Sequence, residues 1–87
     1  MVDSNTTIFN VNILRQELIM MTLNEIIKAL ESCGYNATNQ LVGYLLTNDL
    51  SYITNKNNAR KKIAKFSRDE VLMAIINGYL GKWKKDI

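Results

Sequence analysis

The sequence predicts an all-α fold, a compact bundle of about four main helices with one short additional helical turn. Apolar residues recur at spacings of three and four along most of the 87 residues, which is the period of an amphipathic helix. No stretch alternates polar and apolar residues, as a half-buried strand would. Proline is absent from the chain, so none interrupts a helix from within. With 47% hydrophobic residues, the chain is expected to form one helical domain over residues 10–87.

The first helix is predicted between Asn12, as its N-cap, and Gly34, which supplies the left-handed residue that commonly ends a helix. Residues 1–9, which contain a Ser-Asn-Thr-Thr cluster, show no periodicity and are expected to form a mobile tail. The apolar side of this helix is unusually wide. Leu18, Met20 and Met21 extend it beyond the stripe that one contact with a core needs.

The second helix is predicted to start after Asn36, whose side-chain oxygen can accept hydrogen bonds from the first-turn N–H groups, and to end near Thr47. Residues 50–53 are long enough for a short helical turn, and residues 54–58 are polar and typical of a loop. A third, basic helix over residues 59–66 carries a narrow apolar stripe formed by Ala59, Ile63 and Phe66.

The last helix has the clearest start signal, because Ser67 and Glu70 form a capping box. A regular apolar stripe follows it, and we expect it to be the packed side: Leu72, Ile75, Ile76, Tyr79, Leu80 and Trp83. Ala74 and Gly78 fall on the opposite face. Their small size fits either close packing against another element or tolerance on an exposed turn.

Charge is distributed unevenly along the chain. Residues 1–54 carry two basic and five acidic side chains, whereas residues 55–87 carry nine basic and three acidic ones. The basic half is typical of a protein that binds nucleic acid, a phosphorylated partner or a second copy of itself. The candidate partner-binding surface is Arg60, Lys61, Lys62 and Lys65. A small helical nucleic-acid-binding protein that uses residues 59–66 is the alternative, although the following helix is expected to expose Met73, Ala74 and Asn77 rather than base-reading side chains.

Several functional classes find no residues to support them. The chain has no histidine and a single cysteine, Cys33, so we expect no metal, no cofactor and no internal disulfide. Asp69 and Glu70 are adjacent on a helix and cannot converge on a substrate, so we expect no enzymatic activity. No apolar run approaches the roughly 20 residues of a membrane span, and no leader sequence is visible. We therefore expect a cytoplasmic protein that does not insert into membranes.

The chain resembles the IreB family of small bacterial regulatory phosphoproteins from about Thr6 to Leu80. The resemblance is carried by Gly34-Tyr35-Asn36, Asn39-Gln40-Leu41-Val42-Gly43-Tyr44-Leu45-Leu46, Asp49, Tyr52-Ile53, Ala59-Arg60, Arg68-Asp69-Glu70 and Tyr79-Leu80. It implies a compact helical homodimer without enzymatic activity. It also implies a substrate of a membrane-anchored PASTA-type Ser/Thr protein kinase and its partner phosphatase, acting in the envelope stress response of low-GC Gram-positive bacteria. A second protomer also suits a domain of this size, since one small core supplies limited burial.

The same resemblance places the phosphorylation site in the N-terminal tail. Family members carry modifiable threonines before a Phe-Asn pair, which here is Phe9-Asn10, and Thr6 falls on a family threonine position with Thr7 beside it. An earlier family threonine position is occupied by Asp3, so a two-site switch becomes a single site. Ala37 replaces the family's proline at the start of the second helix, with no change expected in the fold.

Overall fold

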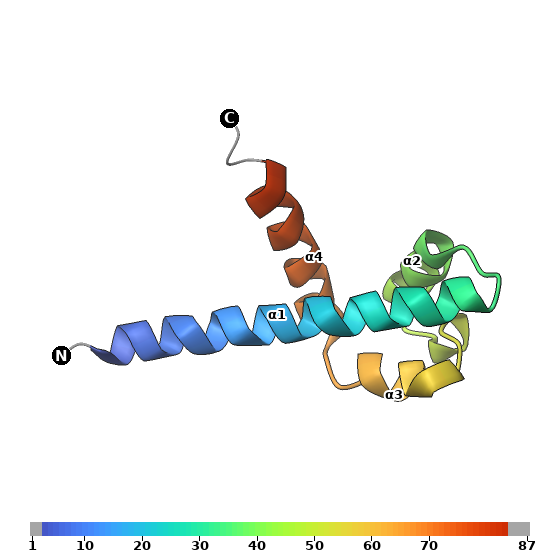
Figure 1. Cartoon of the computed structure of the whole chain (residues 1–87), viewed down its shortest axis with the longest axis horizontal. Helices are drawn as coiled ribbons and strands as arrows, with labels where there is room; N and C mark the ends of the chain where they lie inside the picture. The colour runs from blue at the N-terminus through green and yellow to red at the C-terminus, as the bar shows by residue number, and fades with distance from the viewer. Residues whose placement is uncertain (1–2, 84–87) are drawn as a thin grey trace.

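The computed structural model describes the backbone of residues 3–83 and the side chains of residues 14–81. Over this range the structure is all-helical, as the sequence predicts. Four α-helices and two 3-10 turns follow one another in the order α1 (Asp3–Ser32), α2 (Ala37–Thr47), η1 (Leu50–Tyr52), η2 (Lys56–Asn58), α3 (Ala59–Ile63) and α4 (Arg68–Trp83). The long helix α1 forms the base on which the other elements pack (Figure 1).

Helix α1 begins earlier than the sequence predicts, at Asp3 rather than after Asn12. No glycine or proline lies between these positions, so the local sequence contains nothing that would stop a helix. Whether residues 1–9 are mobile in solution stays a prediction. The C-terminal end is as expected: Gly34 has φ +86°, and the Gly34 and Tyr35 N–H groups donate to the carbonyls of Glu31 and Leu30. These are the two hydrogen bonds of a Schellman motif.

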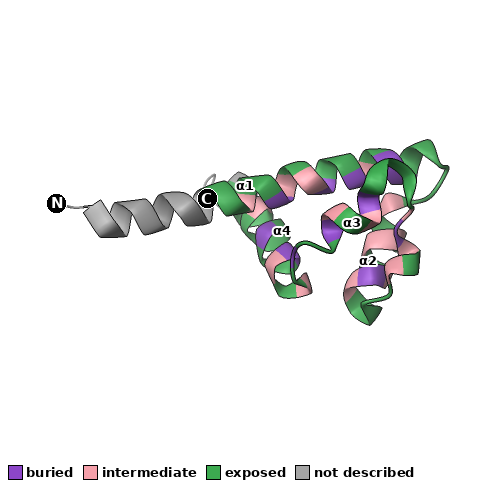
Figure 2. Ribbon diagram, turned by 90° about the horizontal axis from the view of Figure 1, so that it is seen from below, coloured by how far each residue is buried: buried purple, intermediate pink, exposed green. Residues whose placement is uncertain are grey.

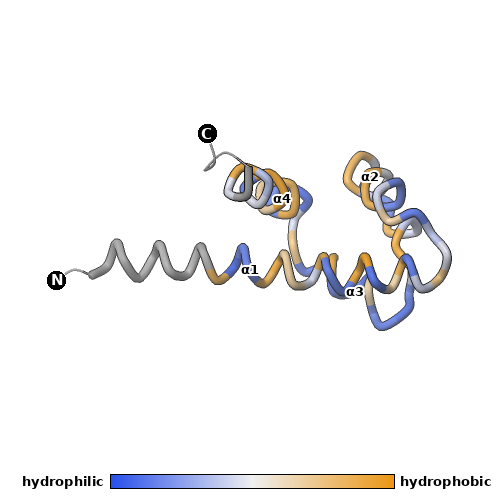
Figure 3. Tube along the Cα trace, turned by 45° about the horizontal axis from the view of Figure 1, so that its top comes forward, coloured by the Kyte–Doolittle hydropathy of each residue, from blue (hydrophilic) through white to orange (hydrophobic). Residues whose placement is uncertain are grey.

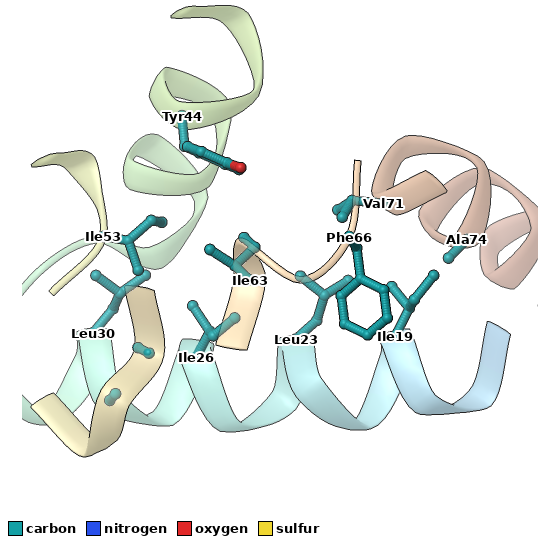
Figure 4. Packing of buried hydrophobic residues seen from close by; sticks show 12 residues of the cluster. Ile19, Leu23, Ile26, Leu30, Tyr44, Ile53, Ile63, Phe66, Val71 and Ala74 are labelled. Carbon is teal, nitrogen blue, oxygen red and sulfur yellow. The ribbon is translucent and has the colours of Figure 1, made fainter. Parts of the chain in front are cut away.

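One face of α1 supplies the largest part of the core. It buries side chains at spacings of four, three and four residues: Ile19, Leu23, Ile26 and Leu30. They meet buried side chains from α2, α3 and α4 and from Ile53, which follows η1 (Figure 4). Part of the wide apolar side predicted from the sequence is not in this core. Leu14, Leu18 and Met21 are all at least half exposed, because they lie on a different side of the same helix.

Helix α2 is held by the caps that the sequence indicates. The Asn36 side chain accepts a hydrogen bond from the Asn39 N–H at 3.0 Å, and the left-handed Asn48 donates its N–H to the Tyr44 carbonyl. Gly43 lies directly against the Tyr52 ring, so closely that a β-carbon there would be 2.5 Å from it. The absence of a side chain at Gly43 therefore lets η1 pack onto α2.

Helix α3 is shorter than predicted. It covers Ala59–Ile63, and the chain then turns through residues 64–67. Its apolar stripe is confirmed, since Ala59, Ile63 and Phe66 are all buried against α1. The burial pattern along the chain shows this inward side between outward-facing polar residues (Figure 2).

Helix α4 begins with the predicted capping box. The Ser67 hydroxyl accepts from the Glu70 N–H at 3.2 Å, and the Glu70 carboxylate accepts from the Ser67 N–H at 3.1 Å. The predicted packed face, however, is wrong. Val71 and Ala74 are buried in the core, whereas Leu72, Ile75, Ile76, Tyr79 and Leu80 are exposed. Small side chains allow α4 to approach α1 closely: a β-carbon on Gly78 would lie 3.2 Å from the end of Met20.

Helices α2 and α4 leave α1 on the same side and stand apart from each other, whereas α3 lies along α1 (Figures 1 and 3). The apolar residues of both upright helices are visible as orange segments in Figure 3. Among residues 3–83, no helix has the length and hydropathy that crossing a bilayer requires.

Candidate interaction surfaces

We call residues 59–66, which comprise α3 and the turn after it, the α3 segment. Its basic residues do not form one uniform surface. The Arg60 guanidinium is half-buried and donates to the Ile53 carbonyl at 2.6 Å, so it fastens the loop before α3. The Lys62 ammonium lies 3.0 Å from the Glu25 carboxylate of α1. Within the described side chains, Lys61 and Lys65 have neither an ion pair nor a hydrogen bond. Only these two of the four predicted cations are thus fully available to a partner.

This division also weakens the nucleic-acid alternative. Binding to nucleic acid requires several cations to contact phosphates at once, because affinity for a duplex grows with the number of phosphates neutralised. Arg60 is committed to the fold and Lys62 to an ion pair. Ala74, which the sequence suggested would be exposed on α4, is buried, although Met73 and Asn77 are exposed as expected.

A polar contact fixes the start of α4 to α1. Arg15 of α1 makes a two-pronged ion pair with Glu70, with nitrogen to oxygen distances of 2.5 and 3.0 Å, and its guanidinium lies 5.2 Å from the centre of the Phe66 ring. The Arg15 hydrogen bonds lower the pKa of Glu70 to about 2, with the Ser67 N–H as the next cause. Glu70 therefore serves both as the helix cap and as the link between two helices.

An apolar depression lies between α2 and α4, with α1 as its floor. We call it the α2–α4 groove. It has a volume of about 430 Å³ and is lined by apolar side chains from all three helices, with two polar residues among them: Met20, Leu23, Asn24, Ile27, Thr38, Leu41, Val42, Leu45, Leu72 and Ile75. The sequence predicts each apolar stripe, but not that they open onto a shared surface.

Further exposed apolar side chains lie one helical turn from groove-lining residues, since Leu46 follows Val42 and Ile76 follows Leu72 by four residues. Leu46 on α2 is 77% exposed and Ile76 on α4 is 54% exposed. Single exposed apolar residues are ordinary on a protein surface, whereas a contiguous set on neighbouring helices is typical of an interface. The sequence showed these residues as the regular apolar stripe of α4, which we predicted to be the packed side. Instead, the face of α4 with small side chains packs on α1, and the face with large apolar side chains is exposed.

Thr6 and Thr7, the candidate phosphorylation sites, lie outside the side chains that the structure describes. Cys33 is exposed, with its sulfur 3.7 Å from the Thr54 hydroxyl. Within the described residues, no three histidine, cysteine or carboxylate side chains come together as metal ligands would.

The family model of the IreB regulatory phosphoproteins matches residues 4–81. The chain belongs to the IreB family. A UPF0297 protein of Clostridioides difficile (strain 630) is 51% identical over 61 residues, which cover 70% of this chain and 72% of the relative. Both findings confirm the resemblance seen in the sequence.

Family membership supplies a coarse functional statement, that of a regulatory protein. The match over residues 4–81 includes the α2–α4 groove, the α3 segment and the positions of Thr6 and Thr7. The features described above are therefore features of the IreB-like part of the chain.

Proposed function

We propose that this protein is a non-enzymatic regulatory phosphoprotein of the cytoplasm, a homodimer modified on Thr6 or Thr7 by a Ser/Thr protein kinase and restored by a phosphatase. The family match carries this proposal, because it describes a regulatory phosphoprotein and includes both threonines. The resemblance in the sequence adds the kinase class and the setting in envelope stress signalling.

The α2–α4 groove supports the homodimer. A monomer would leave the groove and its extension through Leu46 and Ile76 in contact with water. Burying apolar surface contributes about 25 cal/mol per Å², so covering such side chains with a second copy is favourable. A twofold interface uses the same patch on both subunits. Here the exposed apolar face of α4 in one copy could pack into the α2–α4 groove of the other, and the reverse.

Ile76→Glu tests this interface. A charge buried in an apolar contact without a partner is costly, so we expect the dimer dissociation constant to rise at least about tenfold. Met73→Glu is the matched control, since it adds the same charge at an exposed residue that lines a different depression, beside Arg15 and Gln16, and not the α2–α4 groove. Sedimentation velocity over a range of concentrations measures both variants. Equal effects, or an Ile76→Glu protein that dimerises normally, would contradict the proposed interface.

Phosphorylation would change the charge near the start of α1. A phosphothreonine carries about −1.5 to −2 charges, and basic side chains are its usual docking partners. In a continuous helix, Thr6 is about 28 Å along the axis from Glu25, the partner of Lys62, and about 18 Å from Leu18, which shares a depression with Lys65. While α1 stays helical, the phosphate is thus out of reach of Lys61 and Lys65 in its own protomer. It acts on a partner protomer or on another protein.

Incubation with the purified kinase domain and ATP, followed by peptide mass spectrometry, tests the modification. We expect phosphate on Thr6, with Thr7 as the neighbouring site. A Thr6→Ala, Thr7→Ala double variant is the control and should remain unmodified. Phosphate found only elsewhere in the chain, or none at all, would refute this part of the proposal.

A further inference from the structure

Helix α1 has a second exposed apolar side, opposite the α2–α4 groove. Leu18 and Ile27 are separated by about 180° around the helix, since each residue turns it by about 100°. Ile27 lines the α2–α4 groove, whereas Leu18 and Met21 face the α3 side and are half exposed or more. The core needs neither of them. This explains the unusually wide apolar side that the sequence shows for α1.

These residues line a depression of their own between α1 and the α3 segment, which we call the α1–α3 groove. Its volume is about 200 Å³. Leu18 and Met21 form its apolar floor beside the buried Phe66, and the rest of its lining is polar or charged: Thr22, Glu25, Lys62 and Lys65. Lys62 shares its charge with Glu25, but Lys65 has no partner among the described side chains.

We propose that the α1–α3 groove docks an acidic, amphipathic helix of another protein. Its apolar floor accepts side chains spaced three and four apart, which is the usual way an amphipathic helix enters a groove. Lys65, which has no partner among the described side chains, favours acidic flanks on the same helix by charge complementarity. A nucleic-acid backbone fits less well, because phosphates gain nothing from a floor of leucine and methionine.

The inference rests on the proposed function, since it names the kind of partner that a regulatory IreB-family protein would bind. It adds a feature that the basic residues alone do not contain: specificity comes from Leu18 and Met21 together with Lys65, and not from Arg60. Because the two grooves lie on opposite sides of α1, a second copy in the α2–α4 groove leaves this one open. A dimer would then present two such docking sites.

A pair of synthetic peptides tests the proposal on the full ¹⁵N-labelled chain. One is an amphipathic helix with leucines on one face flanked by glutamates, and the other carries lysines in place of the glutamates. We expect the acidic peptide alone to shift the backbone amide resonances of residues 18–25 and 62–66. The proposal would be overturned if the lysine peptide caused shifts of the same size, if the shifts were confined to the α2–α4 groove, or if neither peptide caused shifts.

Matched variants locate the contact. Met21→Gln and Lys65→Glu should each weaken binding of the acidic peptide by about tenfold or more. Met73→Gln and Lys61→Glu are the controls and should stay within about twofold of the unmodified chain. Met73 is as exposed as Met21, at 62%, and Lys61 neighbours Lys62 outside the groove. Equal weakening by the controls would show a non-specific charge effect and refute the groove.

Two further measurements exclude other occupants. If Met21→Gln abolished self-association in sedimentation, a second copy would occupy this groove and the proposal would be wrong. The same holds if duplex DNA shifted the same resonances with an affinity that falls steeply with salt. A Thr6→Ala chain should bind the acidic peptide normally. Loss of phosphorylation therefore refutes the proposed function, and loss of peptide binding refutes only the groove.

Discussion

Helices α3 and α4 both pack on α1, but they divide their side chains in opposite ways. The α3 segment buries its apolar residues Ala59, Ile63 and Phe66 and presents cations outward. Helix α4 buries the small Val71 and Ala74 and leaves its larger apolar residues exposed. The α3 segment thus completes the fold of one chain, whereas α4 leaves apolar surface for a further protein chain to cover. Stability and association are therefore expected to depend on different residues.

The largest expected effect separates these two roles. Ile63 is fully buried, so Ile63→Ala should lower the free energy of unfolding by about 2–5 kcal/mol through lost burial and the cavity left behind. Ile76→Ala removes the same atoms from an exposed site and should cost less than about 1 kcal/mol under conditions where the chain is monomeric. Urea unfolding at low protein concentration measures both. Equal losses of unfolding free energy would show that the face of α4 that carries Ile76 is packed within the monomer.

A smaller effect should appear at the joint between α4 and α1, as a dependence on pH. The pKa of Glu70 is lowered to about 2 in the folded chain, from an ordinary value of 4.5. A lowered carboxyl pKa stabilises the fold fully above pH 4.5, and that contribution is lost as the pH falls towards 2. Glu70→Gln should be less stable than the unmodified chain at pH 7, and the two unfolding curves should converge in acid.

Arg15→Met sharpens the same measurement, because hydrogen bonding to Arg15 is the largest cause of the lowered Glu70 pKa. The pH dependence between 4.5 and 2 should shrink in this variant while the Ser67 cap remains. If the pH dependence were unchanged, the ion pair between α1 and α4 would not contribute in solution.

The smallest expected effect concerns the outer end of α4. A β-carbon on Gly81 would meet no atom within 4 Å, so Gly81→Ala should stabilise the helix by about 0.5–1 kcal/mol through propensity alone. Gly43→Ala is the contrasting variant and should destabilise the fold, since its β-carbon would press on the Tyr52 ring. Thermal unfolding followed by circular dichroism measures the change in stability of both variants: a higher midpoint temperature for Gly81→Ala and a lower one for Gly43→Ala.

Local signals allowed most of the fold to be predicted. The Asn36 cap, the Gly34 stop, and the Ser67 and Glu70 capping box are short-range hydrogen-bonding patterns, so the boundaries they set were correct. The start of α1 was wrong because no residue near Asn12 forces a boundary. The extent of α3 was wrong because its residues 64–66 keep helical spacing while the chain already turns.

The candidate sites depend on contacts that no local pattern contains. Arg60 and Lys65 look alike in the sequence, yet one is held by the Ile53 carbonyl and the other has no partner among the described side chains. Each such assignment depends on which chain segment folds back beside the residue. The sequence-based list of four cations therefore could not separate its members, and their role in partner binding stays a prediction.

The sequence by itself determined the helical class, the caps and the family, because these follow from spacing, from hydrogen bonds between near neighbours and from the order of residues. Only the tertiary structure decided which face of each helix is inside. In α4 two apolar faces were available, and the one with small residues packs on α1 because Val71, Ala74 and Gly78 permit a close approach. That choice leaves large apolar side chains outside, and with them the surface proposed to join two copies of the chain.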